Sequence, residues 1–472
     1  MNSPLNYFTL QIKKLLNFST KNIHIVIYVL IAVLSLDTLL NQTGDLIGKP
    51  LKTFGGIVLF ITLSIITMIG QIFVLQFVSK KSEEIMKKNR KIRLMHRFVS
   101  ISQYTIITIF VFLILEIIIN QNYLPISSML VTLISYMLST ILMAVFTDVF
   151  LSWYKTNRNS VLVLIYGLSF ATAAIASFAI LLVFTYQFSE KLFISILPTS
   201  PGTFLSTEEG SIWKIFAKTY QYNDMVSFFL KWGGTALILY HYSYKIGRAK
   251  YWFLLSLPLL YFSTLMVYHL HIYEPHEEFE QLIFYGVSAL NSTFGGILFY
   301  IAFKLTVKNF KGNELFASYL IMAGYGFMLF FSGSQSVLTN MAYPPFGFST
   351  VSSYGLGSYL ILVGLSLSAI SISKDEQLKE MIKNSTMAES KFLHSIGMSE
   401  SERENKLLKD IVIKAKQQKE NLEKDTGIEL SISEEDIKEF VRELEVNHND
   451  NDNDKDNDKD NDNKEEEEKG NQ

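Results

Sequence analysis

Three of the eight histidines in the chain stand close together among carboxylates. His269, His271 and His276 fall within eight residues of one another. Imidazole nitrogens and carboxylate oxygens are ligands of divalent transition metals. The candidate metal ligands are His271, Glu274, His276 and Glu277. The spacing matches no fixed motif, and Pro275 with its neighbouring glutamates also suits the first turn of a helix. A metal site and a helix start therefore both remain open, and no other cofactor is predicted.

Ionisable residues inside apolar segments are costly and are therefore functional candidates. Four of them fall at a similar predicted depth on the outer side: Asp37, Glu116, Lys231 and His269. One hypothesis is an outward-facing polar pocket in which Lys231 partly neutralises the two acids. The alternative is that each side chain reaches the membrane interface independently.

The chain contains no cysteine. This excludes disulfides, thiolate nucleophiles and cysteine-based metal sites. Paired carboxylates and nucleophile–base spacings are also missing from the sequence. We therefore do not expect an enzyme.

The segments that must position these residues are long and apolar. Of the 472 residues, 49% are hydrophobic and 18% are charged, a balance typical of membrane proteins. A helix needs about 20 apolar residues to cross a bilayer. Ten segments qualify, namely residues 23–40, 54–78, 98–119, 126–150, 160–185, 225–244, 251–270, 282–303, 315–332 and 349–372. The predicted fold is all-α, a polytopic transmembrane helical bundle of about ten spans in the lipid bilayer, with a transmembrane domain over residues 23–372.

Positive charge predicts the orientation of these spans, because Lys and Arg in short loops stay on the cytoplasmic side. The segments on one side of the membrane hold 19 Lys and Arg residues, and those on the other side hold 5. Both termini are therefore predicted to be cytoplasmic, in a multi-pass protein of the cell membrane. Residues 1–22 form a short amphipathic cytoplasmic lead.

Polar side chains recur at helical spacing in two spans. Ser64, Thr67 and Gln71 form one stripe, and the other consists of Ser128, Thr132, Ser135 and Ser139. Such stripes form either a polar pathway or hydrogen bonds between packed helices. Small residues line the segment 160–185 on nearly every face, which predicts a central position in the bundle.

The composition changes abruptly to charged residues after the last span. Residues 374–472 carry 17 basic and 29 acidic side chains. Ser373 and Glu376 form a capping box for a first helix, a second helix is expected over residues 401–424, and a third follows Ser433. Their heptads are too short for a firm coiled-coil prediction. Residues 373–446 are thus a cytoplasmic helical tail, and residues 374–446 could bind a cytoplasmic protein. The Asn-Asp repeats of residues 447–472 predict a disordered acidic terminus. No nucleic-acid partner is expected.

One part of the chain resembles a known group of proteins. The motifs are Tyr343-Pro344-Pro345-Phe346-Gly347, the run from Ser352 to Leu360, and the tail segment Glu389 to Gly397. They resemble uncharacterised polytopic membrane proteins of ammonia-oxidising archaea. The resemblance covers about the last third of the chain before the acidic repeat. It implies a shared architecture of about ten spans with a helical extension, and it implies no activity.

Two functions agree with these features. A receptor or scaffold would couple the outward-facing polar site to the cytoplasmic helices. A transporter or channel for a small solute or cation is the alternative, supported by the number of spans and by the polar stripes. Few charges are predicted deep in the membrane and no convincing internal repeat is found, which favours the first function.

Overall fold

The computed structural model describes residues 23–47, 53–158, 160–194, 212–240, 247–269, 278–309, 313–334, 343–383 and 388–426. All regular structure in these ranges is helical. The helices are α2 (Ile23–Ile47), α3 (Phe54–Lys88), α4 (Arg90–Asn120), α5 (Pro125–Thr156), α6 (Val161–Ile194), α7 (Ile212–Tyr240), α9 (Arg248–His269), α10 (Glu278–Asn309), α11 (Glu314–Ser334), α12 (Phe348–Lys374), α13 (Glu376–Lys383) and α14 (Ala388–Thr426).

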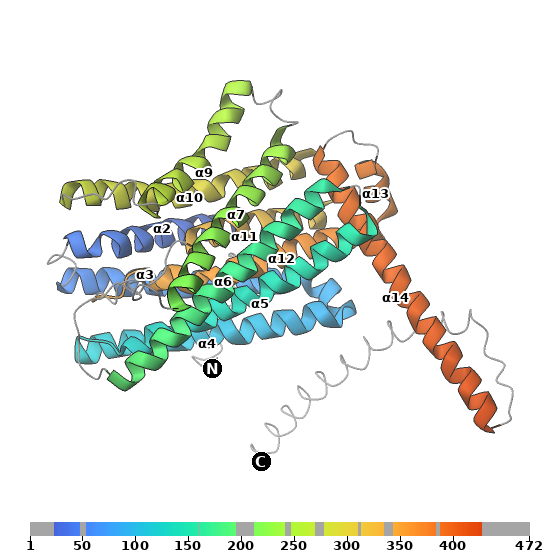
Figure 1. Ribbon diagram of the computed structural model, residues 1–472, viewed down its shortest axis with the longest axis horizontal. Helices are drawn as coiled ribbons and strands as arrows, with labels where there is room; N and C mark the ends of the chain where they lie inside the picture. The colour runs from blue at the N-terminus through green and yellow to red at the C-terminus, as the bar shows by residue number, and fades with distance from the viewer. Residues whose placement is uncertain are drawn as a thin grey trace, which may run out of the picture.

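Most of these helices lie side by side in one bundle (Figure 1). Seven of the described helices are long and apolar enough to cross a membrane: α2, α3, α4, α5, α6, α11 and α12. The protein thus has the apolar helices of a multi-pass membrane protein. Helices α7, α9 and α10 occupy the other three predicted segments. The predicted lead, third tail helix and acidic terminus lie outside the described residues.

Helix α12 is at the centre of the bundle. It contacts α11, α5, α3, α2 and α4, and 23 of its 27 residues are buried. Gly357 and Gly364 allow this packing, because a Cβ atom at either position would lie within 2.7 Å of a backbone nitrogen of α11. The expectation that residues 160–185 form the central helix is wrong. The small residues of α6 instead allow close packing on α5 and α7.

The predicted helical tail begins directly after α12. The predicted cap at Ser373 is wrong, since its hydroxyl donates to the Ile370 carbonyl within α12. The side chain of Asp375 accepts from the Leu378 N–H at 2.9 Å and is the actual cap of α13. Helix α14 starts at Ala388, thirteen residues before the expected second tail helix.

Candidate functional site along helix α12

The Asp37 carboxylate binds the N-terminus of α12. One oxygen accepts from the Gly347 N–H at 3.0 Å. The other accepts from the Thr350 N–H at 3.0 Å and from the Thr350 hydroxyl at 2.9 Å. The first turn of a helix has unpaired N–H groups and a partial positive charge, so it offers hydrogen bonds and a favourable field to a carboxylate. Asp37 therefore joins two helices far apart in the sequence.

Asp37 also lies deeper in its helix than expected. Helix α2 continues to Ile47, so ten residues, about 15 Å of helix, separate Asp37 from its end. Its side chain is fully buried. Gly347 makes this contact possible, because it has a φ of +90° and a Cβ atom there would meet the Asn41 side chain.

Two glutamines continue the polar contacts further along α12. The Gln71 amide on α3 donates to the hydroxyls of Ser352 and Ser353 at 2.7 and 2.9 Å. The Gln103 amide on α4 donates to the Gln71 side-chain oxygen at 2.9 Å. All four residues are fully buried. Of the predicted stripe on α3, Gln71 alone thus connects three helices, α3, α4 and α12.

The α5 stripe contacts another side of α12. The Ser135 hydroxyl donates to the Val351 carbonyl at 2.6 Å, and the hydroxyls of Ser139 and Ser358 are 2.8 Å apart. The Thr132 hydroxyl of the same stripe instead donates to the Ser128 carbonyl of its own helix. Half of the stripe therefore packs against α12 by hydrogen bonding.

Several buried polar atoms in this region have no hydrogen-bond partner in the described part of the chain. They are the hydroxyl oxygens of Ser64, Thr67 and Ser349 and the side-chain oxygen of Gln103. Thr67 is one helical turn from Gln71, and Ser349 is one turn from Ser352 and Ser353. An unpaired buried polar group costs about 1–3 kcal/mol. The region beside α12 therefore combines paired polar side chains with unpaired ones in a buried setting.

The other predicted intramembrane residues have partners of their own. Glu116 is nearly buried and accepts from the Leu124 N–H at 3.2 Å. Lys231 is also buried, and its Nζ lies 4.5 Å from the centre of the Phe330 ring. The carboxylate whose charge acts on Lys231 is that of Asp224. The contacts thus join Asp37, Glu116 and Lys231 to separate neighbours.

The predicted metal ligands His271, Glu274, His276 and Glu277 lie outside the described residues. His269 is the last residue of α9, and its side chain is not described. Within the described ranges, no three His, Asp or Glu side chains are grouped so as to hold a metal ion.

Sequence reasoning missed several polar residues that bind α12. Gln103 lies in a short polar run with Ser102 and Thr105, which the sequence analysis did not single out. His96 on α4 lies just before the predicted span of residues 98–119, yet its ring nitrogen is 2.6 Å from the Tyr359 hydroxyl. The available signal was the hydroxyl-rich run of Ser349 to Ser353 in the last predicted span, which requires polar partners once it is buried.

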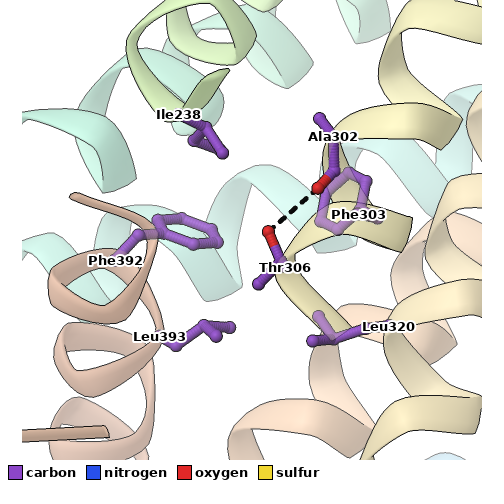
Figure 2. Close-up of a pocket in the computed structure, with 7 residues that line it drawn as sticks. All are labelled: Ile238, Ala302, Phe303, Thr306, Leu320, Phe392 and Leu393. Carbon is purple, nitrogen blue, oxygen red and sulfur yellow. Dashed lines mark hydrogen bonds between the residues drawn. The ribbon is translucent and has the colours of Figure 1, made fainter. Parts of the chain in front are cut away.

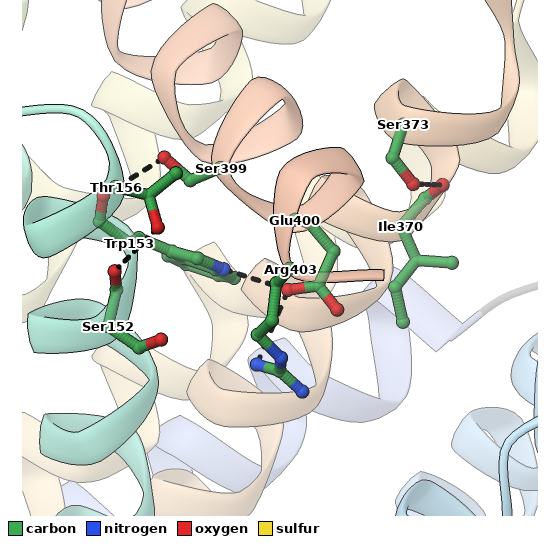
Figure 3. A network of polar contacts seen from close by, with 8 residues as sticks. All are labelled: Ser152, Trp153, Thr156, Ile370, Ser373, Ser399, Glu400 and Arg403. Atoms are coloured by element: carbon green, nitrogen blue, oxygen red, sulfur yellow. Dashed lines mark hydrogen bonds and ion pairs between the residues drawn. The ribbon is translucent and has the colours of Figure 1, made fainter. Parts of the chain in front are cut away.

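The opposite end of α12 contacts the tail helix α14. Gly397 packs so closely on Ile372 that a Cβ atom would clash with this side chain. Figure 3 shows the adjoining polar contacts. The Trp153 indole N–H on α5 donates to a Glu400 oxygen at 2.8 Å, and the same oxygen lies 3.4 Å from Arg403. The Ser399 hydroxyl donates to the Trp153 carbonyl at 3.0 Å.

Apolar side chains of α14 complete this junction. Phe392 and Leu393 are buried, and together with α7, α10 and α11 they enclose a cavity of about 10 Å³ (Figure 2). This volume accommodates about one water molecule. Its one side-chain hydroxyl, that of Thr306, already donates to the Ala302 carbonyl. The cavity is therefore a packing defect rather than a ligand site.

His394 lies beside the packed residues on α14. Burial lowers its pKa below the ordinary value of 6.5, and the charges of Lys383 and Lys379 act in the same direction. The folded tail thus favours the neutral imidazole.

Comparisons with protein-family models, with curated proteins and with solved structures found no match.

Proposed function

We propose that this protein is a receptor or scaffold of the cell membrane, in which the buried polar site along α12 is coupled to the cytoplasmic helices. In this proposal the bundle has about ten spans, both termini are cytoplasmic, and residues 374–446 bind a cytoplasmic protein. Catalysis is not part of the proposal. The proposed kinship with polytopic proteins of ammonia-oxidising archaea rests on the sequence motifs alone.

One observation carries the coupling. The first turn of α12 is held by Asp37, and its last turns pack on α14 through Ile372 and Gly397. A single buried helix therefore contacts both the polar site and the tail. Because packed interiors resist compression, a displacement at one end of α12 is transmitted to the other end.

The absence of cysteine makes this coupling measurable with spin labels. Cysteines at Ile413 on α14 and Val161 on α6 would carry the labels, since these side chains are 53% and 61% exposed. We expect Asp37→Asn to change the distance distribution between the labels. Thr62→Val is the matched control, because the Thr62 hydroxyl is exposed and bonds only to its own helix. Unchanged distances in the Asp37 variant would contradict the coupling.

The number and orientation of the spans can be tested separately. Support for ten spans comes from helices at all ten predicted segments, including α7, α9 and α10. Reporter fusions at Met1 and Gln472 should both report the cytoplasm. Opposite locations of the two ends would exclude an even number of spans.

A transporter or channel for a small solute or cation is the second candidate. The unpaired oxygens of Ser64, Thr67 and Ser349 support it, since a hydrated row of such groups could pass a small polar species. Flux of Na⁺, K⁺ or protons into proteoliposomes, lost on Thr67→Val, would favour this function. Equal leak in the protein-loaded and empty vesicles would reject it for these ions.

A further inference from the structure

Positive charge gathers where α3 meets α4. Between Lys80 and Arg97 the chain has eight Lys and Arg residues and two glutamates. One exposed pair, Lys87 with Glu83 at 3.1 Å, neutralises part of this charge. A cluster of this kind attracts anions. Five further cations are exposed and form no ion pair with the described residues: Lys80, Lys88, Arg90, Lys91 and Arg97.

The basic cluster, residues 80–97, lies on two helices rather than in a loop. Asn89 alone separates α3 from α4. Its side-chain oxygen accepts from the N–H groups of Lys91 and Ile92 at 3.1 and 3.3 Å and so caps α4. The two helices pack on each other on either side of this turn. The positive side chains are therefore held at one end of a helix pair.

The cluster begins where the apolar parts of both helices end. Val78 is the last residue of the predicted span on α3, and Phe98 is the first residue of the predicted span on α4. Lys80 and Arg97 thus lie at the boundary between the hydrocarbon core and the headgroups. Lipid phosphates lie at this depth, because the headgroup layer on each side is about 5–8 Å thick. An arginine can bind a phosphate through two parallel hydrogen bonds.

Exposed residues of α4 form one continuous face. They recur at intervals of three and four residues and therefore lie on the same side of the helix. Helix α4 runs along the edge of the bundle (Figure 1), and it buries the smallest share of its apolar stretch, 33%, among the seven candidate spans. Neighbouring bilayer lipids therefore contact this face. The outer face of α4 consists of Arg90, Leu94, Arg97, Ile101, Tyr104, Thr108, Phe112 and Leu115.

The outer face places positive charge directly beside an apolar track. Arg90 and Arg97 stand at its polar end with Leu94 between them, and Ile101, one turn beyond Arg97, is 67% exposed. From Ile101 to Leu115 the face is about 21 Å long. An acyl chain extends through half of the hydrocarbon core, about 15 Å, so one chain fits alongside the helix. A lipid uses both the charge and the track, whereas a soluble anion uses the charge alone.

We propose that the outer face of α4 binds a phospholipid whose headgroup has a net negative charge. The Arg97 guanidinium pairs with the lipid phosphate, Arg90 and Lys91 add attraction from the headgroup side, and one acyl chain lies along the apolar part of the face. Phosphatidylcholine fits less well, because its ammonium group would lie among the cations of the cluster. This lipid site does not depend on the receptor or scaffold proposal.

Site-specific quenching by brominated lipids tests the assignment. The full chain has no cysteine, so Thr105→Cys can carry a bimane label beside the outer face, at an exposed residue seven positions beyond Phe98. Leu168→Cys is the matched control, since Leu168 is exposed on α6, seven positions beyond the first residue of that helix. Each protein is reconstituted in phosphatidylcholine vesicles with a minor fraction of dibrominated phosphatidylglycerol or dibrominated phosphatidylcholine. We expect the phosphatidylglycerol to be preferred about threefold or more at the Thr105 label and less than about twofold at the Leu168 label.

Removal of charge separates a lipid site from general attraction to the membrane. Arg90→Gln combined with Arg97→Gln should reduce the preference at the Thr105 label to below about 1.5-fold. Lys155→Gln combined with Arg158→Gln removes the same charge from exposed positions at the turn before α6 and should leave the preference unchanged. An unchanged unfolding midpoint of the double arginine variant would show that its weaker preference is not misfolding.

Three results at the labels would overturn the lipid site: equal quenching by both lipids at Thr105, the same preference at both labels, or an unchanged preference in the double arginine variant. The positive charge would then act in topology alone. A preference that appears only after deletion of residues 447–472 would also overturn the site, because the acidic terminus would then be the occupant of the cluster. The spin-label test of the coupling is independent of all these results.

Discussion

The contact between Asp37 and the first turn of α12 makes a quantitative prediction about stability. In Asp37→Asn, one carboxylate oxygen is replaced by an NH₂ group, which cannot accept from the backbone N–H groups of Gly347 or Thr350. The neutral amide also loses the favourable interaction with the helix end. A hydrogen bond to a charged group contributes about 1.5–3 kcal/mol, and a buried N–H without a partner costs a similar amount. We therefore expect the free energy of unfolding to fall by about 2–4 kcal/mol.

Unfolding in mixed micelles with increasing dodecyl sulfate measures this loss through the fluorescence of the four tryptophans. Glu116→Gln is the matched control. It makes the same chemical change at a carboxylate that accepts a single N–H at 3.2 Å, and glutamine keeps an oxygen for this bond. Its expected loss is below about 1 kcal/mol. If Asp37→Asn were as stable as this control, the carboxylate would not be holding α12.

Three further perturbations test other parts of the structure. Gly397→Val places a side chain against Ile372, so we expect α14 to detach and protease cleavage of the tail to accelerate at least tenfold, whereas Gly233→Ala in open space should have no such effect. Because the pKa of His394 is lowered, the tail is most stable above pH 6.5 and loosens as the pH falls below it; hydrogen exchange of α14 should show this change, and His394→Gln should abolish it. Gln103→Leu leaves the Gln71 oxygen without its donor, so we expect a thermal midpoint several degrees lower in detergent, and an unchanged midpoint would exclude a structural role for this bond.

The helices of the bundle could be predicted from the sequence, because an apolar segment in a bilayer must form a long helix to satisfy its own backbone hydrogen bonds. Each of the ten predicted segments coincides largely with one helix, and three of them, residues 160–185, 225–244 and 251–270, extend one to four residues beyond it. The positions at which these helices end were harder to predict. The polar residues after Leu40 suggested a loop, yet α2 continues to Ile47, and Asp37 is therefore further from the helix end than expected.

The partners of the polar residues could not be predicted, since hydrogen bonds between helices depend on rotation and on sequence-distant neighbours. Gln71 was identified by its spacing, but its contact with Ser352 and Ser353 joins positions about 280 residues apart. The central position was assigned to the segment richest in small residues. It belongs to α12, whose glycines face α11 and whose hydroxyls face the other neighbours. Small residues in a helix indicate that at least one neighbouring helix packs closely against it. They do not indicate that the helix is buried on all sides.

The length of α14 has a mechanical consequence. Its N-terminal part is fixed by Phe392, Gly397 and Glu400, and Figure 1 shows its C-terminal half running away from the bundle. Beyond Arg403 the helix continues for 23 residues, or about 35 Å. Such a rod acts as a lever, and a 5° rotation at its fulcrum would displace its tip by about 3 Å. In the proposed receptor or scaffold, a small rearrangement around α12 would thus become a larger displacement at the far end of α14.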